Sequence, residues 1–210
     1  MLTIHGCKGC GNVVIEAICT LVGEPFERRD VEPWKPGPAV DELRALNPNL
    51  QVPTVVTQDG LVMTESVAIA LWLCERHPEA ALAPKLDDPQ RGTFLRWLVY
   101  VAGAIYPMYV VGDFPGRFVA GTEQQQKAFK DKTNDRIVAC WRIVEEQLFP
   151  APHAWMIGAS MTALDVFAAV VTRWRPGREA IRAAAPSVVA AAERVEQHPK
   201  LSALFAANFG

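Results

Sequence analysis

The sequence has no surplus of basic residues. It carries 21 lysines and arginines against 23 aspartates and glutamates, which gives a formal net charge of −2. A chain with this balance has no extended positive surface to attract a polyanion. We therefore expect no nucleic acid and no membrane among its partners, and we expect a small molecule as its substrate.

Long uninterrupted apolar runs and an export signal are also missing. Charged residues break the apolar stretches before they reach the ~20 residues that a membrane span needs. The opening segment Met1–His5 lacks the basic-then-apolar pattern of a secretory signal. Half of the 210 residues are nevertheless apolar, enough to bury a full core in one large or two small domains. We expect a soluble, cytoplasmic protein.

The number of cysteines is odd. The five cysteines are Cys7, Cys10, Cys19, Cys74 and Cys140. Without an export signal, this pattern indicates reduced thiols rather than a disulfide framework. We expect Cys19, Cys74 and Cys140 to be buried and inert. For the closely spaced Cys7 and Cys10 we expect a catalytic or metal-binding role.

Two common site motifs are absent around this cysteine pair. The glycine- and lysine-containing segment 6–11 lacks the Gly-Lys-Ser/Thr spacing of a phosphate-binding loop. No second ligand pair at zinc spacing accompanies His5, Cys7 and Cys10. We therefore expect neither a phosphate loop nor a metal site in this segment.

The first 77 residues alternate short β-like runs with helical stretches. We expect strands at 2–6, 26–31, 52–57 and 61–64, and helices at about 12–22, 39–46 and 65–77. Gly23 suits the left-handed position that ends the first helix, and Asp59-Gly60 is typical of a hairpin turn between the last two strands. The predicted order is β-α-β-α-β-β-α.

The β signals nearly vanish after a proline-bearing linker at 78–88. Helical patterns then occupy about 90–111, 123–148 and 163–174. Thr162 and Asp165 are predicted to form a capping box at the start of the last of these helices. The change of pattern predicts two domains, an α/β domain at 1–77 and an all-α domain at 89–210.

Two spaced motifs resemble those of a known family. The first is Asn-Pro-Asn-Leu-Gln-Val-Pro-Thr-Val-Val at 47–56, and the second is Met-Thr-Glu-Ser-Val-Ala-Ile at 63–69. Together with the order of elements, they resemble the glutathione S-transferase family over nearly the whole chain. The resemblance implies a thioredoxin-like N-terminal domain followed by an all-α domain, glutathione as co-substrate, and a homodimer.

The same resemblance implies where glutathione binds. The Val52–Pro53 peptide bond is expected to be cis, which X-Pro bonds adopt at a cost of about 0.5–1 rather than ~3 kcal/mol. Val52 would then pair through its backbone with the cysteinyl part of glutathione. Ser66, at a helix N-terminus, would hold the γ-glutamyl carboxylate, while Glu65 would meet its ammonium group.

Lys35 and Gln51 match positions that contact the glycyl carboxylate and the backbone of glutathione in bacterial members of the family. Two of these assignments have a simpler alternative. Lys35 lies in a proline-rich loop and is equally well interpreted as an ordinary surface residue. Thr64 or Ser66 can cap the helix, with an acid in its first turn, without binding any ligand.

The Gly-Cys-Lys-Gly-Cys-Gly segment at 6–11 lies between the first strand and the first helix. A helix N-terminus stabilises a thiolate and lowers a cysteine pKa from ~8.5 to about 3.5–7.5, and Lys8 adds positive charge. Members of the resembled family place here the Tyr, Ser or Cys that faces the glutathione sulfur. We choose Cys10 for this role, with Cys7 second. A Cys-x-x-Cys pair is also typical of a dithiol redox centre.

Three functions stay open. The first is a glutathione-dependent transferase that conjugates or transforms a small hydrophobic electrophile. The second is a glutathione-dependent thiol–disulfide oxidoreductase that uses Cys10, and the third is a non-catalytic glutathione-binding module. For the electrophile we expect a pocket on the helices of the second half, with Tyr106 near the glutathione sulfur, although such side chains are also common in a core. The other candidates are Tyr100, Met108, Tyr109, Phe114 and Trp174.

Overall fold

A computed structural model describes residues 1–151 and 153–210. The described chain forms two compact units, one made of Met1–Lys85 with Val195–Gly210 and the other of Leu86–Arg194. The domains predicted from the sequence were 1–77 and 89–210. In the structure, residues 195–210 belong to the first unit and not, as that prediction had it, to the second. Helical periodicity shows that a segment is a helix, but not which core receives its apolar face.

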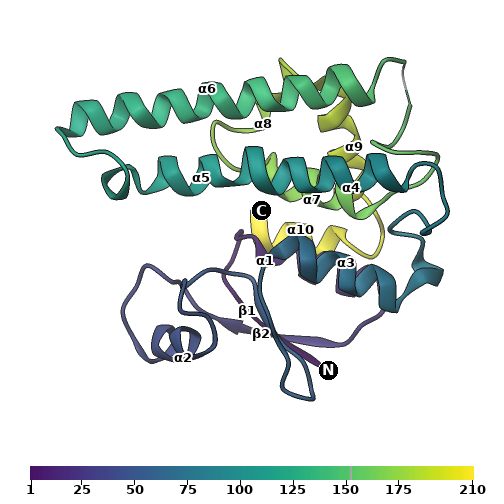
Figure 1. Cartoon of the computed structure of the whole chain (residues 1–210), viewed down its shortest axis with the longest axis horizontal. Coiled ribbons are helices and arrows are strands. Elements are labelled where there is room, and N and C mark those ends of the chain that lie inside the picture. Colours follow the sequence, from purple (N-terminus) through teal and green to yellow (C-terminus); the bar gives the residue numbers. More distant parts are fainter. Residues whose placement is uncertain (152) are drawn as a thin grey trace. The chain divides into compact units, whose positions relative to one another are not determined.

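The first unit contains a four-stranded sheet in the order β2-β1-β3-β4. Its strands are β1 (Leu2–Gly6), β2 (Phe26–Asp30), β3 (Thr54–Val56) and β4 (Val62–Met63). β1 pairs in parallel with β2 and antiparallel with β3, and β3 pairs antiparallel with β4. Helices α1 (Asn12–Val22), α2 (Pro38–Leu46) and α3 (Ser66–Arg76) complete the predicted βαβαββα order (Figure 1).

Helix α1 is buried over most of its length. All of its residues from Asn12 to Cys19 are buried, and the helix contacts both β1 and α3. It ends as predicted at Gly23, which has a φ of 76° and donates its N–H to the carbonyl of Cys19. Because such a helix has no solvent-facing side, any polar residue on it needs a partner inside the protein.

The C-terminal segment packs on the same unit through α10 (Ser202–Phe209), coloured yellow in Figure 1. Leu201 and Phe205 bury their side chains. Lys200 Nζ donates a hydrogen bond of 3.1 Å to the carbonyl of Leu21, near the end of α1. These contacts are the reason that this segment belongs to the first unit.

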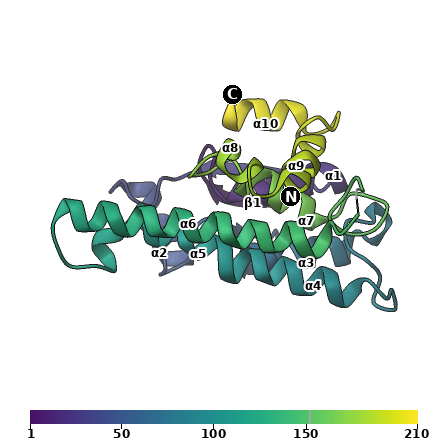
Figure 2. The ribbon, with the colours of Figure 1, turned by 90° about the horizontal axis from the view of Figure 1, so that it is seen from above.

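The second unit is helical. Its helices are α4 (Arg91–Tyr100), α5 (Tyr106–Asp113), α6 (Glu123–Leu148), α7 (Ala163–Val171) and α8 (Arg178–Arg182). Helix α9 (Pro186–Glu196) begins in this unit and ends in the first. Short 3-10 helices lie at Pro115–Arg117 in this unit and at Pro78–Ala80 in the first. Figure 2 shows α6 running along α5, which it contacts. The bounds predicted for α6 are confirmed, whereas α7 ends three residues before the predicted 174. The helix predicted at 90–111 is continuous, but its middle, Val101–Ile105, is a π-helix.

The helical stretch Arg91–Asp113 corrects one expectation from the sequence. By length and composition it is long and apolar enough to cross a membrane, with a mean hydropathy of 1.4. In the structure its bulky residues Phe94, Trp97 and Ile105 are buried in the protein, and its α5 part packs against α6. About a third of its most apolar window is buried inside the protein, and the absence of a membrane partner stays a prediction.

Candidate functional site

The pairing of the strands brings most of the predicted site residues to one end of the sheet. β3 runs antiparallel to β1, so its first residue, Thr54, pairs with His5 near the end of β1. β4 runs antiparallel to β3 and therefore ends at the same side. The residues next to these strand ends are Cys7, Cys10, Gln51, Val52, Pro53, Glu65 and Ser66. β2 is parallel to β1, so the loop that carries Lys35 also begins at this end.

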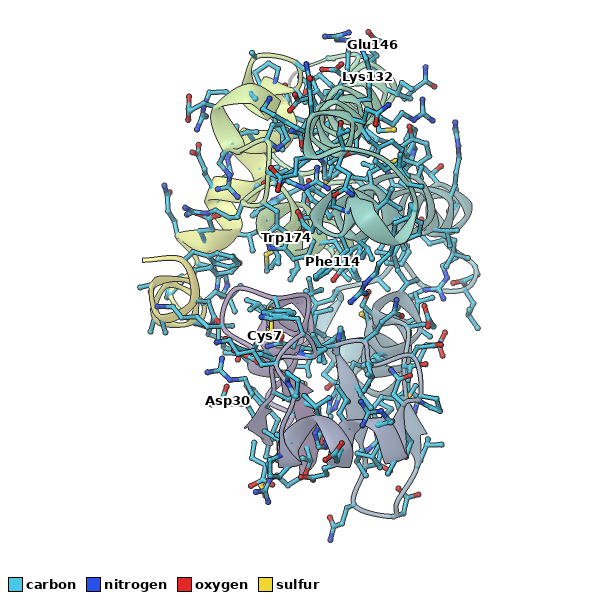
Figure 3. The ribbon with its side chains drawn as sticks, turned by 90° about the vertical axis from the view of Figure 1, so that its left-hand side faces the viewer. Cys7, Asp30, Phe114, Lys132, Glu146 and Trp174 are labelled. Atoms are coloured by element: carbon cyan, nitrogen blue, oxygen red, sulfur yellow. A yellow bond between two sulfur atoms is a disulfide. The ribbon has the colours of Figure 1, made fainter. Side chains whose placement is uncertain are left out.

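Cys7 and Cys10 form a disulfide, with 5.4 Å between their Cα atoms. This corrects the expectation that all five thiols are reduced; Cys19, Cys74 and Cys140 form no disulfide and are buried, as predicted. Cys7, which is labelled in Figure 3, is only 5% exposed, whereas Cys10 is half-buried. Residues 7–10, the cysteine loop, thus present Cys10 as the sulfur that a ligand reaches first.

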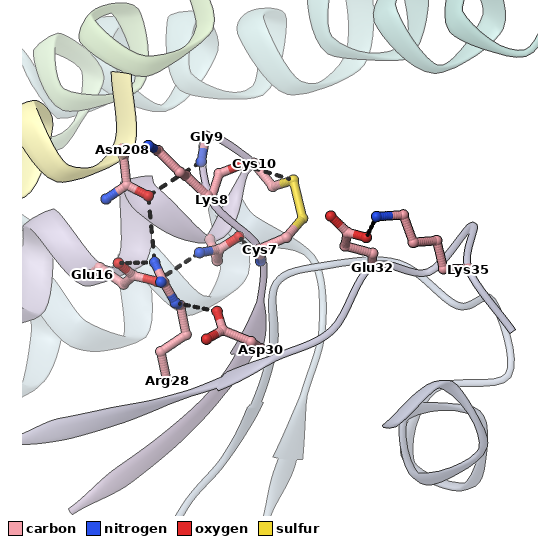
Figure 4. The surroundings of a disulfide bond; sticks show 11 residues. Cys7, Lys8, Gly9, Cys10, Glu16, Arg28, Asp30, Glu32, Lys35 and Asn208 are labelled. Carbon is pink, nitrogen blue, oxygen red and sulfur yellow. Dashed lines mark hydrogen bonds and ion pairs between the residues drawn. A yellow bond between two sulfur atoms is a disulfide. The ribbon is translucent and has the colours of Figure 1, made fainter. Parts of the chain in front are cut away.

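Behind the cysteine loop lies a network of buried hydrogen bonds and an ion pair that was not predicted from the sequence (Figure 4). The backbone N–H of Cys7 donates to Asn12 Oδ1 at 3.0 Å. Asn12 Nδ2 in turn donates to Glu16 Oε1 at 2.6 Å, and Glu16 Oε2 lies 3.7 Å from Arg28 Nη1. Asn12 fits tightly, because a Cβ at Gly6 would come within 2.2 Å of its side chain. The sequence contained one signal for these hydrogen bonds: Asn12 and Glu16 lie four positions apart on a mostly apolar helix.

The Val52–Pro53 peptide bond is cis, as the resemblance implied. Within the described residues, the backbone N–H and C=O of Val52 make no hydrogen bond. The neighbouring carbonyl of Gln51 is occupied, since it accepts from Asn47 Nδ2 at 3.2 Å and from Thr54 Oγ1 at 2.9 Å. Val52 therefore offers one main-chain donor and one acceptor at the margin of the sheet, as an extended peptide ligand requires.

Helix α3 begins without a capping side chain. Its N-cap residue is Glu65, which has a φ of 62° and a ψ of 99°, and no side chain bonds to the first amide groups. The alternative in which Thr64 or Ser66 caps the helix is therefore not what the structure contains. A left-handed φ is uncommon for a residue other than glycine and is found more often at functional sites. The uncapped amides and the helix dipole favour a bound anion here.

Lys35 lies beside a cavity of about 500 Å³ next to the cysteine loop. Cys7, Lys8 and Arg28 contribute to the lining of the same cavity. Lys35 is exposed and forms an ion pair with Glu32. To bind Lys35, the glycyl carboxylate of glutathione would have to replace Glu32 as its ion-pair partner. The role of Lys35 as a ligand contact and its role as an ordinary surface residue therefore both stay open.

Tyr106 lies in the second unit, whereas the other predicted site residues lie in the first. It follows the π-helix directly and packs edge-on against Trp174, with 5.1 Å between the ring centroids. Tyr109 packs against the same indole at 5.0 Å and donates its hydroxyl to the carbonyl of Val171. Burial raises the pKa of both tyrosines. These rings therefore form an aromatic cluster of neutral phenols.

In the part of the chain that the structure describes, no three His, Cys, Asp or Glu side chains come together in a group that could hold a metal ion.

Two family models match the chain. The model described as glutathione S-transferase, N-terminal domain, matches residues 15–76, and that described as glutathione S-transferase, C-terminal domain, matches residues 115–208. The chain is 30% identical to the uncharacterized GST-like protein YncG of Escherichia coli strain K12, over 99% of this chain and 98% of that protein. It is 27% identical to the glutathione S-transferase GstA of Escherichia coli O157:H7 over 78% of each chain.

Solved structures share the fold over the whole length. A glutathione transferase homologue from Sulfitobacter, crystallised with bound glutathione, aligns with a TM-score of 0.84 and 20% identity over 100% of this chain and 99% of that one. The glutathione S-transferase of Xylella fastidiosa aligns with a TM-score of 0.85 and 20% identity over 99% and 98%. At these identities the likeness shows the fold, and it confirms the predicted two-part architecture.

Proposed function

Because this chain belongs to the glutathione S-transferase family, we propose that it binds glutathione on its first unit and transfers it to a small hydrophobic electrophile. The observation that carries the proposal is the uncapped start of α3, at the same end of the sheet as the unpaired backbone of Val52 and the cysteine loop. The amides at the start of α3 suit an anion, and the backbone of Val52 suits an extended peptide. Glutathione contains both.

The ligand would lie across these groups in one orientation. The γ-glutamyl carboxylate would accept the amides at the start of α3 beside Ser66, and Glu65 would meet the ammonium group. The cysteinyl backbone would pair with Val52, which directs its sulfur to the start of α1 and Cys10. The N-terminus of α1 would favour the thiolate over the thiol. Two structural neighbours, from Sulfitobacter and from a sphingomonad, are described as bound to glutathione.

The transfer step follows from this placement. The thiolate of glutathione attacks an electrophilic carbon, a C–S bond forms, and the electron pair leaves with the departing group or moves onto the electrophile. The thiol proton is released before the attack, because the thiolate is the nucleophile. A contact of Tyr106 with the electrophile stays a proposal from the sequence and the family resemblance. The homodimeric state is proposed on the family resemblance, and the cytoplasmic location stays a prediction from the sequence.

A second candidate function is favoured by the Cys7–Cys10 disulfide. A sulfur pair that can close is able to exchange with disulfides, so the protein could act as a glutathione-dependent thiol–disulfide oxidoreductase. In that reaction the sulfur of Cys10 is itself the nucleophile and forms a mixed disulfide with glutathione. In the transferase reaction Cys10 only lies next to the sulfur of the ligand.

Replacement of Cys10 by serine separates the two functions. We expect Cys10→Ser to take up glutathione in calorimetric titrations as the wild type does, and to keep conjugation of aromatic halides or epoxides within about tenfold. Reduction of a glutathione mixed disulfide should fall by about 100-fold or more in the same variant, because the nucleophile is gone. Cys74→Ala, which removes a buried thiol of α3 that forms no disulfide, is the matched control and should keep both activities.

Three results would change the assignment. Reduction of a glutathione mixed disulfide by the wild type without any conjugation, and its loss in Cys10→Ser, would make the oxidoreductase the better description. Uptake of glutathione without any turnover by the wild type would leave a binding module. No uptake of glutathione at millimolar concentrations would contradict the proposal as a whole.

A further inference from the structure

The last helix reaches the cysteine loop through one buried asparagine. Asn208 of α10 is 5% exposed, and its Nδ2 donates to the carbonyl of Leu204 at 2.9 Å. That bond fixes the orientation of the amide, so that Oδ1 accepts the backbone N–H of Gly9 at 3.2 Å and Arg28 Nη1 at 3.4 Å. The side chain therefore joins α10, β2 and the middle of the cysteine loop.

The end of α10 also lies close to the backbone of Gly9. Gly9 has a φ of 70° and lies between the two cysteines. A Cβ built at this position would lie 3.4 Å from the carbonyl oxygen of Asn208 and 3.6 Å from the ring of Phe209. A side chain at this position would therefore be in ordinary van der Waals contact with the end of α10, and the left-handed φ is what favours glycine here.

Two polar chains from the cysteine loop meet at one arginine (Figure 4). The N–H of Cys7 leads through Asn12 and Glu16 to Arg28, and the N–H of Gly9 leads through Asn208 to the same guanidinium. Arg28 Nε is held in turn by Asp30 at 2.7 Å. The loop backbone is therefore fixed at two points, one from α1 and one from the C-terminus of the chain.

We propose that α10 supports the cysteine loop, and that Asn208 is a positioning residue. Its hydrogen bond to the loop shifts the equilibrium between the Cys7–Cys10 dithiol and the Cys7–Cys10 disulfide toward the disulfide. The inference deepens the proposed function, since it concerns the same loop that faces glutathione. The relevant co-reactant is glutathione disulfide. The Cys10 thiolate attacks one of its sulfurs and releases one glutathione thiolate, and the Cys7 thiolate then attacks the Cys10 sulfur and releases the second. Two electrons pass from the protein pair to glutathione disulfide.

The physical basis is pre-organisation of the reduced loop. Closure is an intramolecular reaction, so its equilibrium depends on the effective concentration of one sulfur at the other. Hydrogen bonds that hold the backbone of the loop in the closing geometry raise that concentration. Removal of one bond frees the reduced loop more than the closed one, because the disulfide already restrains the closed loop.

The test compares three variants at redox equilibrium. Wild type, Asn208→Ala, Asn208→Asp and Ser202→Ala are equilibrated with mixtures of glutathione and glutathione disulfide, quenched with acid, and alkylated for mass spectrometry of the peptide with residues 7 and 10. We expect Asn208→Ala to shift the equilibrium constant toward the dithiol by about fivefold, the effect of one ordinary hydrogen bond. Asn208→Asp keeps an oxygen that accepts the Gly9 N–H, so its equilibrium constant should stay within about twofold of the wild-type value. Ser202 is exposed on the same helix, so Ser202→Ala should match the wild type.

An unchanged equilibrium in Asn208→Ala would overturn the inference, as would an Asp variant as impaired as the Ala variant. Should Asn208→Ala fail to fold, Asn208→Ser takes its place, because a serine hydroxyl is too short to reach Gly9. The equilibrium is measured without any electrophile. A protein without transferase turnover would therefore still report on Asn208, and a failure of the proposed function would remain distinguishable from a failure of this inference.

Discussion

Glu16 is a carboxylate on a helix whose neighbouring positions are filled by core side chains. It is 2% exposed. Burial raises the pKa of Glu16, while the hydrogen bond from Asn12 and the charge of Arg28 lower it. A buried charge is tolerated only with such partners. The spacing of Asn12 and Glu16 can be read from the sequence, but Arg28 comes from β2, and only the folded chain brings it to α1.

The raised pKa of Glu16 predicts a pH dependence of stability. Below its ordinary value of 4.5, the carboxyl is protonated in the folded and unfolded states and its contribution is fully present. As the pH rises through the raised folded pKa, the folded state binds the proton more tightly than the unfolded state, so this contribution is lost. Glu16→Gln keeps an acceptor for Asn12 and removes the titration. The difference in free energy of unfolding, variant minus wild type, should therefore increase from pH 4 to pH 7.

Urea unfolding at a series of pH values measures this difference. Glu146→Gln, which changes an exposed glutamate of α6, is the matched control. A difference for Glu16→Gln that is constant with pH, or that decreases as the pH rises, would show that Arg28 and Asn12 outweigh burial.

At the scale of elements, helix starts were predicted better than the local geometry of long helices. The capping box of α7 is present as predicted: Asp165 Oδ2 accepts the N–H of Thr162 at 2.8 Å. The π-helix at Val101–Ile105 was not predicted, because one extra residue per turn does not disturb an apolar pattern enough to be seen. It nevertheless changes the direction of every following side chain, beginning with Tyr106.

The two capping boxes of the second unit should differ in strength. Asp165 is buried and also accepts the N–H of Met156 at 2.8 Å, so Asp165→Ala leaves several buried donors without a partner and should cost about 3 kcal/mol of unfolding free energy. Gln125 closes the exposed box of α6 with Thr122. Gln125→Ala should cost about 1 kcal/mol or less, because water replaces the lost acceptor.

Chemical denaturation of both variants measures these two costs. Equal losses of unfolding free energy in Asp165→Ala and Gln125→Ala would contradict the assignment of a buried structural role to Asp165.

At the scale of the whole molecule, the chain returns to the unit in which it began. The first unit is built from Met1–Lys85 and completed by Val195–Gly210. The returning segment contributes Leu201 and Phe205 to the buried core, in addition to the contact of Asn208 with the cysteine loop. The C-terminus is thus part of the candidate glutathione-binding unit.

Deletion of residues 199–210 should loosen the first unit selectively. Hydrogen exchange of the backbone amides of α1 and the cysteine loop should accelerate by about tenfold or more, since they lose the packing of α10. The amides of α6 in the second unit serve as the internal control and should keep their protection. Unchanged exchange in α1 and the loop would show that the C-terminal segment does not stabilise this unit.

The sequence by itself determined the order of the elements, the α/β and all-α halves, the family, and the residues that flank the ends of the strands. These features follow from local patterns: apolar periodicity, turn residues and two short motifs. Only the tertiary structure decided that Cys7 and Cys10 form a disulfide, that no side chain caps α3, that 195–210 joins the first unit, and that Asn208 and Arg28 hold the cysteine loop. Each of these depends on contacts between residues far apart in the chain or on side-chain geometry, and periodicity carries no information about either.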